Sequence, residues 1–196
     1  VVPGHLGSMR FLLQDIFKEF PAAAMQPGDV FMNNDPYHGG SHLPDIGVFR
    51  PIFYENRLIA FAGCLIHYTD VGGMVPGSNP MTATELYQEG LVIPPVKLCD
   101  AGRENKTLID LICANVRVPD IFMGDLRAQE GALVKGEQRL RDLLDRYGYN
   151  EVSNAMEMLL DYTEKKAREA IRAIPNGVYE FSDYMDHDGV DLAKPV

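Results

Sequence analysis

Residues 46–68, IGVFRPIFYENRLIAFAGCLIHY, decide the fold that the sequence predicts. Both halves are rich in β-branched and aromatic residues, and the polar pair at positions 55–56 separates them, which is typical of a β-hairpin. The second strand of an antiparallel hairpin ends at the edge of the sheet where the first strand begins. We therefore expect the segment before residue 46 and the segment that starts at residue 67 to meet in space.

Both of these segments are loops rich in glycine and proline that carry histidine and aspartate. The first, residues 33–47, reads NNDPYHGGSHLPDIG and follows a short apolar strand predicted within residues 29–34. The second, residues 67–80, reads HYTDVGGMVPGSNP. An H-x-x-D motif occurs in each loop, as His42 with Asp45 and as His67 with Asp70. This repetition is the clearest functional indication in the sequence.

The chemistry of these side chains fits a metal site. Two imidazoles with one or two carboxylates suit a divalent ion such as Mn, Fe or Zn, and the absence of cysteine from both loops argues against a structural zinc site. Three or four protein ligands leave a position open for water or substrate, as in catalytic sites. A purely architectural role is the alternative, because a histidine at a strand end is often a hydrogen-bonded structural residue and an aspartate beside proline often caps a turn.

Other polar residues near these loops have less definite roles. His38 is either a proton-transfer group or a surface residue, and its neighbours Asp35 and Tyr37 are more suited to shaping a pocket than to holding an ion. Glu85 and Glu89 would share one face of a short helix predicted at residues 82–90, as a solvated acidic face or as a ligand or general base. The sequence contains no GxxxxGK[ST], GxSxG or GxGxxG motif, so it offers no nucleotide site or serine nucleophile.

The remaining chain is predicted to be mainly helical. Apolar spacing predicts a helix over residues 8–20, and further helices are expected at 105–116, 125–147 and 150–174, with an extended segment at 91–98 and strand alternation at 178–186. The expected fold is therefore α+β: an N-terminal helix and a mixed β-sheet with a hairpin, then a long antiparallel helical hairpin and a returning strand. We expect residues 1–196 to form a single partial domain of a longer chain, divided into residues 1–100 (sheet-rich), 101–175 (helical) and 176–196 (the start of a further β element).

Composition limits the class of protein. The 196 residues are 46% hydrophobic, which is enough for a sizeable core, and the net charge of −10 argues against nucleic acid or an anionic membrane as a partner. No apolar run reaches the roughly 18 residues of a membrane span, and no secretory signal pattern is present. The three cysteines form no C-x-x-C pair and are expected to be buried thiols. We expect a cytoplasmic protein.

Three runs of residues in order resemble the hydantoinase B / 5-oxoprolinase family. They are GDVFMNNDPYHGGSHLPDIGVFRPIF (28–53), HYTDVGGMVPGS (67–78) and YQEGLVIPPVKL (87–98), and HLGSM at residues 5–9 is also similar to that family's pattern. The family includes the B subunits of ATP-dependent N-methylhydantoinases, the corresponding half of 5-oxoprolinase, and related subunits of acetone and acetophenone carboxylases. Because family members are several hundred residues long, the resemblance implies that this chain is a fragment.

The resemblance also implies roles for individual residues. His42, Asp45 and His67 would be metal ligands, Asp70 a further ligand or a group beside the ligands, and His38 or Asp70 a proton relay. A further aspartate ligand of the family would fall before residue 1, which leaves the site incomplete.

The activity implied is the hydrolysis of a small cyclic amide, a lactam or a hydantoin, after its carbonyl oxygen has been phosphorylated. ATP and Mg would be bound by a hydantoinase A-like subunit or fused domain, so a hetero-oligomer is expected and the fragment alone would be inactive. The alternatives are a subunit of an ATP-dependent ketone carboxylase and a non-catalytic scaffold subunit.

Overall fold

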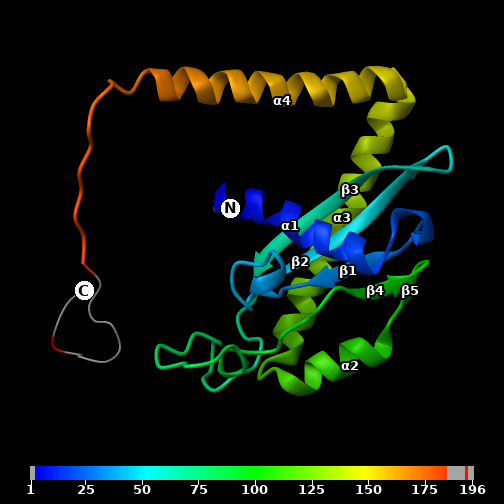
Figure 1. Ribbon diagram of the computed structural model, residues 1–196. Coiled ribbons are helices and arrows are strands. Elements are labelled where there is room, and N and C mark those ends of the chain that lie inside the picture. Colours follow the sequence, from blue (N-terminus) through cyan, green and yellow to red (C-terminus); the bar gives the residue numbers. More distant parts are fainter. Residues whose placement is uncertain (1–2, 185–192, 194–196) are drawn as a thin grey trace. The chain divides into compact units, whose positions relative to one another are not determined.

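The structure is a computed structural model in which residues 3–184 and 193 are described (Figure 1). The chain divides into two compact units, Val1–Arg146 and Tyr147–Val196, and each is described by itself. The first unit is built on a five-stranded sheet in the order β3-β2-β1-β4-β5. The strands are β1 (Val30–Asn33), β2 (Asp45–Tyr54), β3 (Arg57–His67), β4 (Val96–Asp100) and β5 (Arg103–Glu104).

The α+β class is confirmed, but the expectation of a mixed sheet is wrong. All four strand pairs of the sheet are antiparallel. A parallel pair needs a crossover connection, usually a helix. The α-helices of this unit lie before β1 or after β5 in the chain, so none is placed to make such a crossover.

The predicted hairpin is confirmed as β2 and β3. Its register runs from Tyr54 opposite Arg57 at the turn to Asp45 opposite His67 at the open end. The two turn residues, Glu55 and Asn56, have φ angles of 48° and 61°, the left-handed conformation that a tight two-residue hairpin turn requires.

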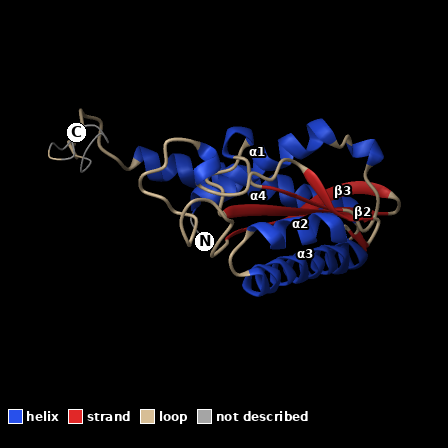
Figure 2. Cartoon of the chain, turned by 90° about the horizontal axis from the view of Figure 1, so that it is seen from below, coloured by secondary structure: helices blue, strands red, loops and turns tan. Residues whose placement is uncertain are grey.

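Helices cover both faces of the sheet (Figure 2). Helix α1 (Pro3–Glu19) buries Leu12 and Ile16 against Phe31 and Phe49 on one face. Helices α2 (Lys106–Asn115) and α3 (Pro119–Tyr147) pack on the other face, in a larger core that includes the following residues: Met32, Ile46, Val48, Ile112, Phe122, Leu126 and Leu133. Successive strand residues therefore alternate between two separate cores.

The expected boundaries of these helices need correction. Helix α1 begins five residues before the expected start at residue 8, and α3 begins at Pro119 instead of residue 125, with proline in the first helical position where its missing N–H costs nothing. The expected helix at 82–90 is wrong, because only the 3-10 turn η3 (Leu86–Gln88) forms there. A single turn between Pro80 and Gly90 is too short to offset the cost of helix nucleation.

The second unit contains helix α4 (Tyr149–Arg172), close to the expected range of 150–174. The strand expected at 178–186 is wrong for residues 178–184, which form no regular element, and residues 185–186 lie outside the described part. An isolated extended segment needs a neighbouring strand, and the described part of this unit offers none. The antiparallel packing of the two long helices and the single-domain organisation stay predictions. None of the described helices is long and apolar enough to cross a membrane.

Candidate metal centre

Asp45 and His67 form the last residue pair of the β2–β3 ladder. His67 Nδ1 lies 3.3 Å from Asp45 Oδ1. Just past this pair, the backbone N–H of Tyr68 donates to the carbonyl of Pro44 at 2.8 Å, which holds the two chain segments together beyond the strands. The two His/Asp loops therefore meet, as the hairpin predicted.

His42 reaches the same carboxylate from the loop. The backbone N–H of Asp45 donates to the carbonyl of His42 at 3.0 Å, so the chain turns tightly between them. His42 Nδ1 lies 2.8 Å from Asp45 Oδ2, and the rings of His42 and His67 are 4.9 Å apart between centroids. One ligand atom from each of these three residues lies within 4.8 Å of the other two.

The orientation of His42 favours a cation over a simple hydrogen bond. Its Nδ1 is buried and has no hydrogen-bond partner, although the distance to Asp45 satisfies that of an ion pair. Two facing groups that approach to 2.8 Å without hydrogen-bond alignment resemble ligand atoms directed at a common ion. The Asp45 side chain is only 1% exposed, and a buried carboxylate needs compensating positive charge or hydrogen bonds.

Two further residues contact Asp45, and the sequence pattern did not predict either contact. His5, in the first turns of α1, places Nε2 3.0 Å from Asp45 Oδ2, and the Ser41 hydroxyl donates to the same oxygen. His5 lies outside the group of three mutually close residues. The HLGSM run contains His5, but only the packing of α1 onto the sheet reveals that this side chain faces the site.

Asn34 fixes the shape of the loop that carries His42. Its side chain is fully buried, and Nδ2 donates to the carbonyls of Leu43 at 2.7 Å and Leu91 at 2.9 Å. Its Oδ1 accepts the backbone N–H of Ile93 at 2.7 Å. One amide thereby ties three chain segments together, and one of them is the residue next to His42.

The glycines at 39 and 40 let this loop approach its neighbours. Gly39 has a φ of 103°, and a Cβ there would lie 2.5 Å from the carbonyl carbon of Phe11 in α1. A Cβ on Gly40 would lie 2.5 Å from the carbonyl oxygen of Asn34. A side chain at position 39 would push the loop away from α1, and one at position 40 would push it away from Asn34.

Asp70 is directed to a different set of partners. Its 4% exposed side chain accepts hydrogen bonds from the backbone N–H groups of Gly72, Gly77 and Arg117 at 2.9, 3.0 and 3.1 Å, and from the Arg117 guanidinium at 3.0 Å. Burial alone would raise the pKa of Asp70, but these bonds outweigh it and lower that pKa. The carboxylate therefore organises its own loop, and the structure does not place it in the group around Asp45.

His38 lies near a cavity instead of among the three clustered residues. Its Nδ1 is 2.8 Å from Asp35 Oδ2, and Asp35 also accepts the backbone N–H of Tyr37. A cavity of about 400 Å³ is lined by Asp15, Glu19, Asp35, His38, Pro94 and Pro95.

Tyr37 is 81% exposed, and Glu85 and Glu89 flank the turn η3. None of these three lies in the group around Asp45.

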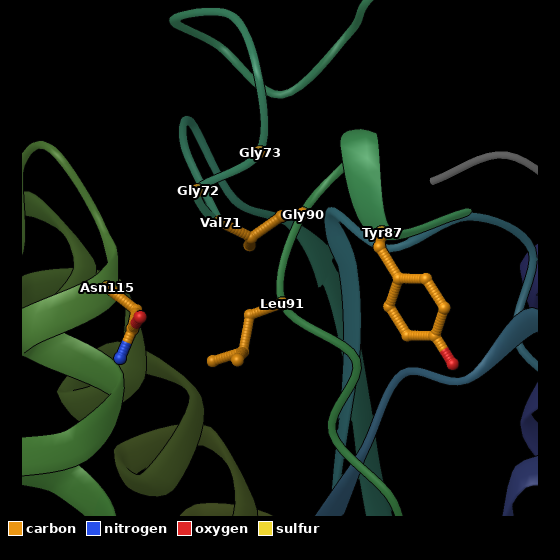
Figure 3. Close-up of a pocket in the computed structure, with 7 residues that line it drawn as sticks. All are labelled: Val71, Gly72, Gly73, Tyr87, Gly90, Leu91 and Asn115. Carbon is orange, nitrogen blue, oxygen red and sulfur yellow. The ribbon is translucent and has the colours of Figure 1, made fainter. Parts of the chain in front are cut away.

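The loop after His67 lines a second, smaller pocket (Figure 3). The pocket has a volume of about 180 Å³ and is lined by Val71, Gly72, Gly73, Tyr87, Gly90, Leu91 and Asn115. The backbone N–H of Leu91 donates to the carbonyl of Val71 at 2.8 Å, which keeps the two glycine-containing walls together.

A family model described as Hydantoinase B/oxoprolinase matches residues 1–196. The chain belongs to this family. The chain is 37% identical over 193 residues to the beta subunit of caprolactamase from Pseudomonas jessenii, covering 98% of this chain and 33% of that protein. It is also 37% identical to a putative D-/L-hydantoinase B subunit of Pseudomonas sp. (strain NS671), covering 98% and 32%. It is 30% identical to the acetophenone carboxylase delta subunit of Aromatoleum aromaticum (strain DSM 19018 / LMG 30748 / EbN1), covering 85% and 24%.

Among solved structures, the chain matches the crystal structure of ATP-dependent caprolactamase from Pseudomonas jessenii with a TM-score of 0.81 at 39% identity. The match covers 88% of this chain and 30% of that one. This chain thus spans about a third of the length of the caprolactamase and hydantoinase relatives.

Proposed function

We propose that this chain carries the metal site of the B component of an ATP-dependent cyclic amidohydrolase. The observation that supports this proposal most directly is the convergence of His42, Asp45 and His67, whose ligand atoms lie within 4.8 Å of one another. Relatives named caprolactamase and hydantoinase support a lactam or hydantoin ring as the substrate class.

The three side chains suit a divalent ion of the Mn, Zn or Fe type. Two imidazole nitrogens and one carboxylate form a borderline-hard donor set, and three ligands leave positions for water and substrate. When bound, such an ion supplies Lewis acidity and lowers the pKa of water that it binds. Ser41 and His5 fix the carboxylate of Asp45, because both approach its Oδ2.

Asp35 and His38 form a pair suited to proton transfer. The contact of Asp35 with Nδ1 orients the imidazole and leaves Nε2 as the nitrogen that exchanges a proton with a bound group. Because His38 lines the cavity of about 400 Å³, we assign it a proton-relay role in preference to Asp70, whose oxygens are occupied by Arg117 and backbone N–H groups.

The activating step belongs to a partner. An amide is a poor electrophile, and phosphorylation of its carbonyl oxygen by ATP makes the carbonyl carbon more electrophilic. Addition of water at that carbon lets the ring C–N bond break, with the ring nitrogen leaving as it takes up a proton, and hydrolysis of the resulting acyl phosphate releases phosphate. The sequence has no nucleotide-binding motif, so ATP and Mg are assigned to an A-type subunit or fused domain, in a heteromeric complex. The names of the relatives as subunits support this arrangement.

The similarity to the acetophenone carboxylase delta subunit supports a second candidate, a ketone carboxylase subunit. The two are separated by assaying the intact complex with cyclic amides and, in parallel, with ketones and bicarbonate. Ring opening coupled to ATP hydrolysis supports the first candidate, and bicarbonate-dependent ATP consumption with a ketone supports the second.

His67→Ala should abolish turnover whether the complex is an amidohydrolase or a carboxylase, whereas unchanged turnover would point to a scaffold subunit. Glu85→Gln, in an exposed turn, is the matched control and should leave turnover unchanged.

A further inference from the structure

A buried amide joins helix α3 to both strands of the metal-bearing hairpin. Gln129 is 1% exposed, and its Nε2 donates to the carbonyls of Ile46 in β2 at 3.0 Å and Cys64 in β3 at 3.1 Å. Its Oε1 accepts the hydroxyl of Tyr68 at 2.6 Å. Ile46 and Tyr68 are the immediate chain neighbours of Asp45 and His67.

The partners allow only one orientation of this amide. Carbonyl oxygens can only accept hydrogen bonds, so the NH₂ group must face Ile46 and Cys64. The amide oxygen then faces Tyr68, which must donate. Burial is the main factor that raises the pKa of Tyr68, so its hydroxyl keeps the proton that it donates. Both donors and the acceptor of Gln129 are therefore used.

This contact falls where the sheet gives the hairpin least support. β1 pairs with β2 only as far as Asn33 opposite Gly47, and β3 is the edge strand of the sheet. Beyond Gly47, residues 45 and 46 have β3 as their sole strand neighbour in the described sheet. The ring of Phe122 from α3 adds a second anchor, with its centroid 4.5 Å from that of Tyr68.

We propose that Gln129 is a positioning residue for the metal centre. By attaching both strands and Tyr68 to α3, its amide sets the separation of Asp45 and His67 before an ion binds. The inference rests on the proposed metal site, because a fixed separation matters most for two residues that bind the same ion. Groups that orient metal ligands typically change metal affinity by about 10- to 100-fold when they are removed.

The test compares Gln129→Met, which keeps the length of the side chain and removes all three hydrogen bonds, with the unvaried intact protein. Mn²⁺ and Zn²⁺ affinities are measured by titration of metal-free protein, and hydrogen exchange of the Asp45 and Tyr68 backbone amides is followed without metal. We expect the Kd to rise by about tenfold or more and these two amides to exchange faster. The amide of Leu98 in β4 should be unchanged.

Two more variants keep the result interpretable. Leu133→Ala opens a space in the same core one turn further along α3, and it should lower the unfolding temperature while leaving metal affinity within about twofold of the unvaried protein. Tyr68→Phe removes only the hydroxyl and should shift affinity and exchange in the direction of Gln129→Met, which decides the matter if Gln129→Met does not fold.

The inference would be overturned if Gln129→Met and Tyr68→Phe both kept the metal affinity and the exchange rates of the unvaried protein. It would also be overturned if Leu133→Ala lost as much metal affinity as Gln129→Met. If the unvaried protein binds neither ion, the proposed metal site fails. The exchange data on metal-free protein then decide the positioning role alone, and unchanged exchange refutes it.

Discussion

Asp45 and His67 are separated by 22 residues in sequence, yet they stand directly opposite each other at the open end of the β2–β3 hairpin, with their side chains 3.3 Å apart. Opposed residues of an antiparallel pair project to the same face of a sheet. A slip of the register by a single residue would send the two side chains to opposite faces. The approach of Asp45 to His67, on which the proposed metal site rests, therefore depends on the hairpin register, and that register depends on the residues that hold the loop and the open end in place.

Replacing Gly39 by alanine should destabilise the loop that carries His42. A Cβ at this position would meet the backbone of Phe11 at 2.5 Å, and the φ of 103° is unfavourable for any other residue. We expect a loss of about 2 kcal/mol or more in the free energy of unfolding, measured in urea, together with weaker metal binding.

Gly131→Ala is the matched control for this substitution. Gly131 lies inside α3 with no atom within 4 Å of an added Cβ, so alanine there should stabilise the protein by about 0.5–1 kcal/mol. Equal effects of the two substitutions would show that the close approach at Gly39 is unimportant.

Asn34→Ala should be among the more damaging single changes in the first unit. It removes three hydrogen bonds and leaves the carbonyls of Leu43 and Leu91 and the N–H of Ile93 without their buried partner. The expected loss is about 2–4 kcal/mol in the free energy of unfolding. Asn154→Ala, on the exposed surface of α4, should stay within about 0.5 kcal/mol of the unvaried protein. A similarly small effect of Asn34→Ala would contradict the proposed role of this amide.

Asp70→Asn should change how stability depends on pH. Because the folded state lowers the pKa of Asp70, its contribution is fully present above the unfolded value of about 3.9 and is lost as pH falls through the lower folded value. The variant should be less stable than the unvaried protein at pH 7, and its stability should fall less steeply from about pH 4 downward.

Urea unfolding at a series of pH values measures this difference. Asp110→Asn, at an exposed i,i+4 pair with Lys106, is the control and should change stability much less, because solvent screens an exposed ion pair. If Asp70→Asn leaves both the stability at pH 7 and the acid slope unchanged, its bonds to Arg117 are not stabilising.

The hairpin and the approach of its two loops were predictable because they follow from local pattern. Strand alternation, a two-residue polar turn and antiparallel connectivity are enough to bring residue 45 to residue 67. The same reasoning wrongly predicted a helix around Glu85, since helical periodicity over a few residues says little about whether a helix nucleates. It also predicted a strand at residues 178–186, of which residues 178–184 form none, because alternation does not reveal whether a partner strand exists.

Contacts between distant segments were not predictable in this way. Asp70 binds Arg117, 47 residues away, and Gln129 binds Ile46, 83 residues away, and neither pair has a spacing that marks it in the sequence. His5 reaches Asp45 only because α1 packs across the sheet. For the same reason, the H-x-x-D motif at His67 overstated the likeness between Asp70 and Asp45, whose environments are set by tertiary packing.

We propose that His42, Asp45 and His67 hold one divalent ion, and calorimetric titration of the metal-free intact protein with Mn²⁺ and Zn²⁺ measures that binding. We expect about one ion bound per chain, with affinity reduced by about 100-fold or more in His42→Ala and in His67→Ala. Binding of either ion with the same affinity in both variants, or no binding to the unvaried protein, would contradict it.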